Sequence, residues 1–207
     1  MTFDHTRLDY LRAQMKDRLS PHRFAHTCGV EETAAQMAEI YCPEKTDLLR
    51  AAALLHDMTK EYTREQTDAV IAREGIALRE DERESGQILH AITAPPEILR
   101  CYPEFAHSEV LSAVRWHTTA RAGMTLAESI LYLADVIEPG REYPALRALR
   151  ERFFGALPEK MGYLERMLHL QSVLLDSLVR TRDWLRAKGD EVCAETLEAI
   201  EDLKTMR

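Results

Sequence analysis

Residues 51–57 read Ala-Ala-Ala-Leu-Leu-His-Asp, so an imidazole and a carboxylate directly follow the most apolar stretch of the chain. A run of alanine and leucine is typical of a buried helix. Burial of His56 and Asp57 without partners would cost several kcal/mol, so other polar groups must surround them. The stretch therefore predicts an interior helix from about Thr46 to Tyr62, with a polar site at its histidine and aspartate.

The remaining sequence also favours helices. Apolar residues between Leu8 and Leu19 recur at steps of three and four, and no useful run alternates between apolar and polar residues. Only 8 glycines and 8 prolines occur in 207 residues, too few for the many turns of a sandwich or barrel. These patterns predict an all-α fold, a single-domain helical bundle spanning residues 1–207.

Capping and breaking residues divide the chain into further predicted helices. The first three run from Ser20-Pro21 to Tyr41, from Thr63 with Gln66 to Gly75, and through His90 to a break at Pro95-Pro96. The next two run from a Ser108 cap to Thr118 and from Thr125 with Glu128 to Pro139-Gly140. The last two run from Pro158 to Gly189 and onward from an Asp190 cap. The charged residues 76–84 predict a surface connection. No flexible linker divides the chain, so we expect the C-terminal helices, 146–207, to pack on the rest.

Charge and composition exclude several classes of protein. The chain has 27 Lys and Arg against 35 Asp and Glu, a formal net charge of −8, so no overall field would attract nucleic acid. No apolar stretch reaches the ~20 residues that span a bilayer, and no signal-peptide pattern is present. The four cysteines are scattered without a C-x-x-C pair, which fits neither a zinc knuckle nor a disulfide scaffold. We expect a cytoplasmic protein that binds neither nucleic acid nor membrane.

Other polar residues interrupt the apolar faces of separate predicted helices. They are His26, His90, His117 and Asp135. Neutral imidazole and ionised carboxylate are ligands of divalent iron, manganese and zinc, and separate helices of a bundle can direct them to one point. Taken alone, the His-Asp pair could instead be satisfied locally, by a backbone carbonyl and a cap, and His90 could be a core histidine. The whole set predicts a metal site.

Several ordered blocks resemble a known family. They are residues 23–27 (RFAHT), 53–57 (ALLHD) with Lys60, 116–119 (WHTT) with Gly123-Met124, 132–135 (YLAD) and 137–139 (IEP). They resemble the HD-domain superfamily of metal-dependent phosphohydrolases and, more narrowly, its YqeK family. The resemblance covers an HD core of about 20–145. It implies an all-α enzyme that hydrolyses dinucleoside tetraphosphates, such as diadenosine tetraphosphate, symmetrically into two nucleoside diphosphates.

The resemblance also implies roles for individual residues. The metal ligands would be His26, His56, Asp57 and Asp135. They would hold a divalent metal, with iron expected first and Mn²⁺ or another divalent ion as alternatives. His90 and His117 would contact the nucleotide phosphates or protonate the leaving oxygen, although in two-metal relatives these positions bind a second ion.

Further charged and polar side chains complete the site that the resemblance implies. Arg23, Thr118, Asp135 and Arg141 fall where substrate contacts are expected. Asp57, Lys60, His90 and His117 form the predicted catalytic group, in which water on the metal attacks an inner phosphorus while Lys60 and Arg141 offset the developing charge.

Two departures from the family pattern leave the shape of the nucleotide pocket open. The family commonly has Thr-Thr-Gly-Arg where this chain has Thr118-Thr119-Ala120-Arg121, and prolines interrupt residues 94–105. Alternatives are a nucleotidase with another nucleotide substrate, a non-catalytic HD-like module, and a di-iron oxygenase on the same scaffold. The presence of every ligand counts against the module. The leucines from Leu164 to Leu178 predict core or a homodimer seam.

Overall fold

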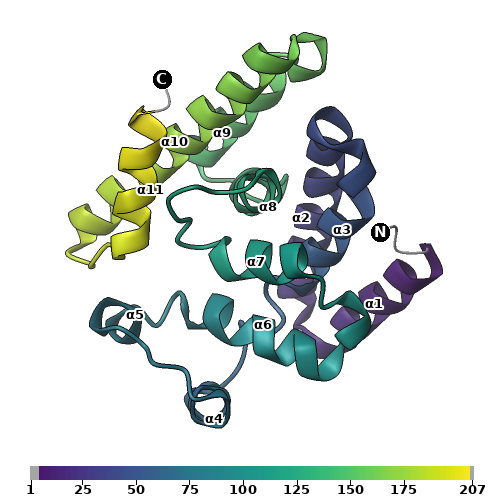
Figure 1. Ribbon diagram of the computed structural model, residues 1–207, viewed down its shortest axis with the longest axis vertical. Coiled ribbons are helices and arrows are strands. Elements are labelled where there is room, and N and C mark those ends of the chain that lie inside the picture. The colour runs from purple at the N-terminus through teal and green to yellow at the C-terminus, as the bar shows by residue number, and fades with distance from the viewer. Residues whose placement is uncertain (1–4, 206–207) are drawn as a thin grey trace.

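The computed structural model describes residues 5–205, apart from the side chain of Glu84 (Figure 1). All of its regular structure in that range is helical, which confirms the all-α prediction. The α-helices are α1 His5–Arg18, α2 Pro21–Tyr41, α3 Thr46–Leu55, α4 Arg64–Glu74, α5 Glu80–Glu84, α6 Leu89–Cys101, α7 Ser108–Trp116, α8 Leu126–Ile137, α9 Pro144–Gly155, α10 Tyr163–Lys188 and α11 Ala194–Thr205. Short 3-10 turns lie at Pro43–Lys45, Pro103–Phe105 and Pro158–Lys160.

Several helix boundaries follow from local chemistry, as predicted. The hydroxyl of Ser20 accepts a hydrogen bond from the amide of Arg23 at the start of α2. Capping boxes open α4, with Thr63 and Gln66, and α8, with Thr125 and Glu128. Gly75 and Gly189 end α4 and α10 in the left-handed conformation.

Helix α3 ends at Leu55, so its predicted extension to Tyr62 is wrong. The Nδ1 of His56 lies 2.6 Å from the carbonyl oxygen of Ala53, which a continuing helix would offer to the amide of Asp57. The following residues form turns in which the amide of Met58 donates to Leu55 and that of Lys60 to Asp57. The side chains that the sequence places on a helix therefore lie on a turn.

The break predicted at Pro95-Pro96 is also wrong, because α6 continues through both prolines. They remove two amide donors, but Ala94 and Ile98 on either side are fully buried in the core. Tertiary packing therefore holds the helical path where the local sequence opposes it.

Three predicted caps lie elsewhere. The Nδ1 of His107 accepts from the amide of Glu109, so His107 and not Ser108 caps α7, which ends at Trp116 rather than Thr118. Pro158 begins a separate 3-10 turn, and α10 begins only at Tyr163. Asp190 pairs with Lys188, and α11 starts four residues later. Helix α5 lies inside the predicted connection 76–84, and α9 has no counterpart among the predicted helices.

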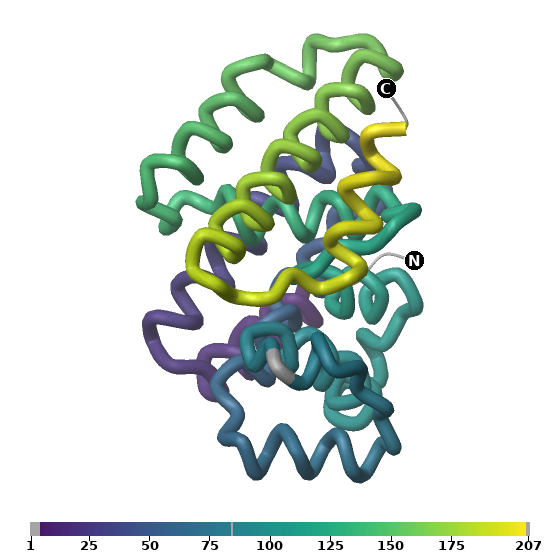
Figure 2. Tube along the Cα trace, turned by 90° about the vertical axis from the view of Figure 1, so that its left-hand side faces the viewer, coloured from purple at the N-terminus to yellow at the C-terminus, as the bar shows by residue number. Residues whose placement is uncertain are grey.

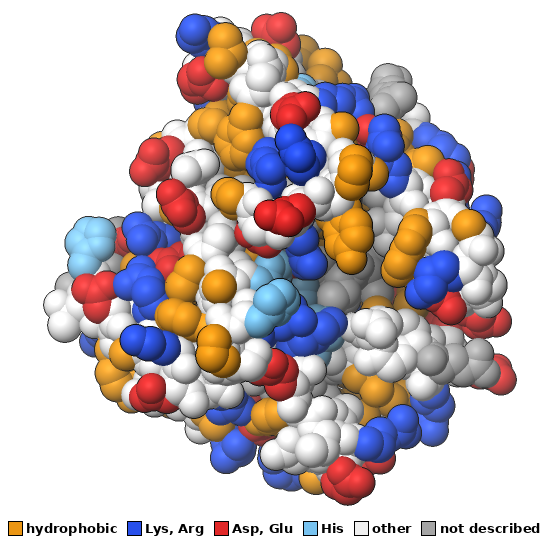
Figure 3. Space-filling view, turned by 180° about the vertical axis from the view of Figure 1, so that it is seen from behind, with side chains coloured by type: hydrophobic (Ala, Val, Ile, Leu, Met, Phe, Trp, Pro, Cys, Tyr) orange, Lys and Arg blue, Asp and Glu red, His pale blue; other side chains and the backbone are white. Residues whose placement is uncertain are grey.

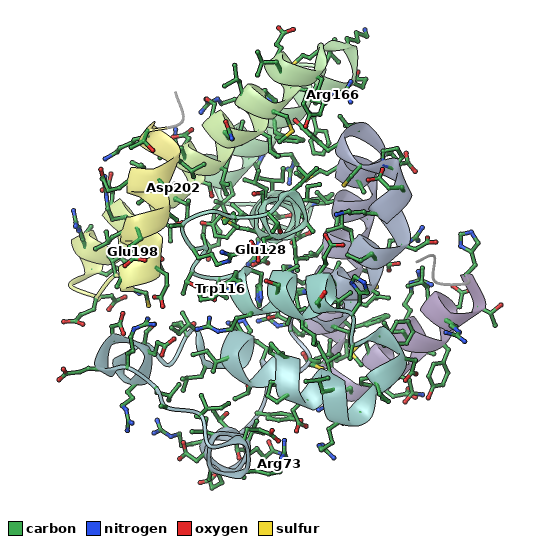
Figure 4. The ribbon with its side chains drawn as sticks, in the orientation of Figure 1. Arg73, Trp116, Glu128, Arg166, Glu198 and Asp202 are labelled. Atoms are coloured by element: carbon green, nitrogen blue, oxygen red, sulfur yellow. The ribbon has the colours of Figure 1, made fainter. Side chains whose placement is uncertain are left out.

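Helix α3 is largely buried and packs on α1, α2, α7 and α8 (Figure 1). Helices α9 and α10 extend side by side, with α11 against α10 (Figure 2). One hydrophobic core joins the N-terminal helices to these C-terminal ones, from Leu8 to Leu203. Asp202 of α11 also accepts a hydrogen bond from the amide of Gly123 in the loop before α8 (Figure 4).

The leucine series of α10 divides between core and surface. Leu170, Leu174 and Leu178 are buried, whereas Leu164 and Leu168 are 69% and 44% exposed. All four cysteines are free thiols, as predicted. Within residues 5–205, no helix combines the length and apolarity needed to cross a membrane.

Candidate metal centre

Six polar residues that are distant in the sequence converge at the centre of the bundle. His26 comes from α2, His90 from α6 and Asp135 from α8, while His56, Asp57 and His117 lie on the turns that follow α3 and α7. The Nε2 of His26 lies 2.9 Å from Asp135 Oδ1 and 3.7 Å from Asp57 Oδ2. Figure 3 shows histidine and basic side chains gathered in a hollow on one face of the molecule.

Two of the histidines directly follow a helix, and a hydrogen bond to a carbonyl of that helix orients each ring. His56 Nδ1 donates to the Ala53 carbonyl and His117 Nδ1 to that of Val114, both at 2.6 Å and both three residues back. We assign the tautomers from these acceptors. In each ring the Nε2 then carries a lone pair that faces the centre, which is the form that binds a metal.

His26 is oriented by a carboxylate that the sequence analysis had not given a role. Its Nδ1 lies 3.1 Å from Oε1 of Glu138, whose other oxygen accepts from the amide of Gly140 at 2.5 Å. A Cβ at Gly29 would lie 2.5 Å from Glu138 Oε2, so a larger residue there would displace this carboxylate from its present position. The signal in the sequence is an acidic residue directly after Ile137, at the end of a largely buried helix.

Two arginines lie against the carboxylates of the centre. Arg23 Nη1 is 2.8 Å from Asp57 Oδ2, and Arg141 Nη2 is 2.7 Å from Asp135 Oδ1. Both guanidinium groups are partly exposed, whereas Asp57 is buried. The positions predicted for phosphate contact therefore meet at the edge of the metal centre.

A chain of hydrogen bonds runs from Lys60 into the same centre. Lys60 Nζ lies 3.2 Å from His90 Nδ1, and His90 Nε2 lies 3.1 Å from His117 Nε2 and 3.2 Å from Asp57 Oδ1. Because an ammonium can only donate, His90 Nδ1 is the acceptor and its Nε2 carries the proton. His90 thus presents an N–H to the centre.

The environment separates the charge states of these groups. Burial and the neighbouring His56 and His90 lower the pKa of His117 to about 3. Burial also opposes the charged form of His26, yet the adjacent carboxylates of Asp135 and Glu138 outweigh it and raise its pKa to about 9. Burial alone would raise the pKa of Asp57, but His56 and His90 hold it well below its ordinary value. The carboxylates are therefore ionised at neutral pH.

The donor set fits a divalent metal. Nε2 of His26 and Nε2 of His56 are buried and face carboxylate oxygens, at 2.9 Å from Asp135 Oδ1 and 3.4 Å from Asp57 Oδ2, but neither forms a hydrogen bond of good geometry with a described residue. Ligand atoms of His26, His56 and Asp57 lie within 4.8 Å of one another, as do those of His56, His117 and Asp135 and those of Asp57, His90 and His117. These carboxylates and oriented imidazoles could together hold a metal ion, which would displace the proton of His26.

Thr118 is the predicted site residue with the weakest link to the centre. It is half-buried in the turn after His117, and its hydroxyl has no hydrogen-bond partner within the described chain. Two positions further on, Ala120 has a φ of 58°, in the left-handed region that favours glycine. That conformation gives a physical reason for the glycine found at this position in the Thr-Thr-Gly-Arg pattern.

Residues 23–140 match the family model of the HD domain, and the chain belongs to this family. It is similar to two proteins described as symmetrical bis(5'-nucleosyl)-tetraphosphatases. The one from Halalkalibacterium halodurans is 30% identical over 91% of this chain and 92% of its own length. The one from Bacillus subtilis is 30% identical over 89% of this chain and 90% of its own. These relatives confirm the resemblance to the YqeK family of HD hydrolases.

A solved structure supports the fold over its whole length. It is a Clostridium acetobutylicum protein described as a "predicted HD superfamily hydrolase involved in NAD metabolism". The two chains superimpose with a TM-score of 0.81 at 28% identity, covering 100% of each. The C-terminal helices are therefore part of the shared architecture.

Proposed function

We propose that this protein is a metal-dependent phosphohydrolase that splits dinucleoside tetraphosphates symmetrically into two nucleoside diphosphates. The observation that carries the proposal is a pair of buried Nε2 atoms, on His26 and His56, that face the ionised carboxylates of Asp135 and Asp57 and have no other polar partner of good geometry among the described residues. The names of the relatives supply the substrate class, and the residues of the centre suit its chemistry.

His26, His56, Asp57 and Asp135 hold the metal in this proposal, and iron is the ion that we expect. When bound, such an ion polarises a phosphoryl oxygen and lowers the pKa of the water that it binds toward neutrality. The protein contributes the orientation of the ligands. Glu138 fixes the ring of His26, and the Ala53 carbonyl fixes that of His56.

His90 is suited to donate a proton or hydrogen bond to the leaving diphosphate. Its N–H at Nε2 faces the centre because Lys60 donates to its other nitrogen. His117, which is neutral, accepts from His90 and so holds the ring in place. Arg23 and Arg141 are suited to pair with phosphate oxygens, and the free hydroxyl of Thr118 can donate to the same group.

The position of Lys60 also favours hydrolysis over di-iron oxygen chemistry. A second ion on Asp57, His90 and His117 would need a lone pair at His90 Nε2, which carries the proton. It would also lie close to an ammonium, and like charges repel. A single ion on the His26 side avoids both costs.

The experiment is a product screen with metal-replete protein. Diadenosine tetraphosphate, ATP, ADP and deoxynucleotides are incubated separately, and nucleotide products are separated by chromatography. We expect ADP as the sole product of diadenosine tetraphosphate, and slower release of phosphate from the mononucleotides. Release of AMP with ATP, or preference for a mononucleotide, would contradict the proposal.

A further inference from the structure

A pocket beside the metal centre has no part in holding the metal. It lies between the turn after α3, the start of α4 and residues 86–90, and Lys60, Tyr62, Arg64, Thr67, Gln87 and Leu89 are among its lining residues. It joins the centre through His90, which lines the pocket and also lies 3.2 Å from Asp57 Oδ1. His90 is therefore shared by the pocket and the reaction site.

The ammonium at the mouth of this pocket has only neutral partners in direct contact. Lys60 Nζ lies 3.3 Å from the carbonyl oxygen of Gln87 and 3.2 Å from His90 Nδ1, and no carboxylate of the described chain forms an ion pair with it. Burial lowers its pKa. A half-buried cation without a carboxylate partner is suited to bind an anion.

The basic residues around the centre fall into two groups on either side of Asp57. Arg23 contacts the Oδ2 atom of that carboxylate, whereas His90, with Lys60 behind it, contacts Oδ1. Arg141 lies with the first group, on the His26 side, through Asp135. The two flanks therefore each offer positive charge to a polyphosphate that crosses the centre.

Symmetric cleavage sets the geometry that such a substrate needs. The bond that breaks is the middle anhydride of the tetraphosphate, so two phosphates and a nucleoside extend from it on each side. A phosphate beside Lys60 would place the attached nucleoside further along the same flank. There the pocket offers the aromatic ring of Tyr62, the hydroxyl of Thr67, the side-chain amide of Gln87 and the apolar surface of Leu89.

We propose that this pocket binds the nucleoside of one half of the dinucleoside tetraphosphate, with Lys60 on its phosphates. The inference rests on the proposed function and adds where one of the two nucleosides lies. Nothing in the metal centre itself requires the pocket, so the pocket can be blocked without touching a ligand.

Gly86 allows the test. It is exposed, it lines the pocket, and a Cβ added there would meet nothing within 4 Å. The Gly86→Trp variant places a large ring at the lining of the pocket and is expected to obstruct it, and Gly86→Ala is its matched control. We expect the KM for diadenosine tetraphosphate to rise at least tenfold in the tryptophan variant, with kcat within twofold, and both constants unchanged in the alanine variant.

A second variant makes the outcome independent of the folding of the first. Arg64 is exposed and, among the described residues, pairs only with Asp68, so Arg64→Glu is expected to fold and to raise the KM at least threefold. Circular dichroism and thermal melting check all variants. The inference would be overturned if a folded Gly86→Trp protein showed a rise in KM of less than threefold. If that variant does not fold, the same result in Arg64→Glu would overturn it. Absence of hydrolysis by the wild type would overturn the proposed function, and this inference with it.

Discussion

Two buried polar clusters in this protein differ in how completely their atoms are paired. Glu97 of α6 is 1% exposed and accepts hydrogen bonds from Arg73 at 2.5 Å, from Arg100 at 2.7 Å and from the hydroxyl of Tyr62 at 2.8 Å. Its cluster ties α6 to α4, which carries Arg73 (Figure 4), and to the turn after α3. Both carboxylate oxygens have partners, so this cluster needs nothing further.

The histidine cluster contains the same types of group but leaves some of them open. The Nε2 atoms of His26 and His56 face the carboxylates of Asp135 and Asp57 without a hydrogen bond of good geometry to any described residue, although both Nδ1 atoms are satisfied. Leaving a buried polar atom unpaired costs about 1–3 kcal/mol, and native proteins keep such unpaired atoms where function requires them. The cluster around Glu97, whose atoms are fully paired, is closed and structural, whereas the histidine cluster is open and suited to bind a ligand.

The largest expected effect comes from removing a ligand from the open cluster. His56→Ala should lower hydrolysis of diadenosine tetraphosphate by more than about 100-fold and abolish stoichiometric metal, because one oriented lone pair is lost. Metal is measured by mass spectrometry beside the rate. His22→Ala, at an exposed histidine of α2, is the control and should match the wild type. Full metal and full activity in His56→Ala would refute the assignment.

A smaller effect is expected from the carboxylate behind His26. Glu138→Gln keeps the size of the side chain but weakens the hold on Nδ1, so metal affinity should fall about 10–100-fold. Competition with a chromogenic chelator measures the dissociation constant. Glu142→Gln, four residues on and exposed, serves as the control. An unchanged dissociation constant would mean that Glu138 does not orient the ligand.

A substitution in the closed cluster should lower the free energy of unfolding and leave metal binding unchanged. Its arginines, above all Arg100, lower the pKa of Glu97 to about 2 from 4.5, so its contribution is fully present above pH 4.5 and is lost as the pH falls toward 2. Because those arginines are partly exposed, the contribution is about 1–2 kcal/mol. Urea unfolding of metal-free wild type and Glu97→Gln should differ by this amount at pH 6, and less at pH 3.

Two controls accompany the Glu97 variant. Glu104→Gln, at an exposed position, should unfold like the wild type at both pH values. The metal content of Glu97→Gln should equal that of the wild type. A stability difference that does not depend on pH would show that the charge of Glu97 contributes nothing.

The smallest expected effect lies at Ala120, between the open cluster and α8. Its positive φ strains an alanine, so Ala120→Gly should raise the free energy of unfolding by about 0.5–1 kcal/mol. Denaturant titration measures the change. Ala122→Gly, exposed in the same loop, should bring no gain, and an equal gain there would remove the explanation.

Much of the fold was predictable because its signals are local. The capping boxes at Thr63 and Thr125, the Ser20 cap and the glycines after α4 and α10 act within one turn of the chain. The break at Pro95-Pro96 was predicted wrongly because burial of Ala94 and Ile98, a long-range effect, outweighs a local penalty. The end of α3 was missed because the histidine ring takes the carbonyl that would continue the helix.

The candidate site was predictable to a similar degree. Polar residues in apolar segments, together with the family resemblance, selected the six residues that the structure brings together. The role of Glu138 could not be predicted, because its contact with His26 spans 112 positions in the sequence. The tautomer of His90 depends on Lys60, which lies 30 positions away, and spacing alone carries no information on such pairs.

The central claim is that the open cluster is a single-metal hydrolytic centre. The most direct test prepares the protein without metal, adds Fe²⁺ anaerobically in steps, and measures ADP formed from diadenosine tetraphosphate at each step. We expect no hydrolysis without metal, a rise that saturates at about one equivalent per chain, and ADP as the sole nucleotide product. Hydrolysis that is independent of metal, or that saturates only at two equivalents, would contradict it.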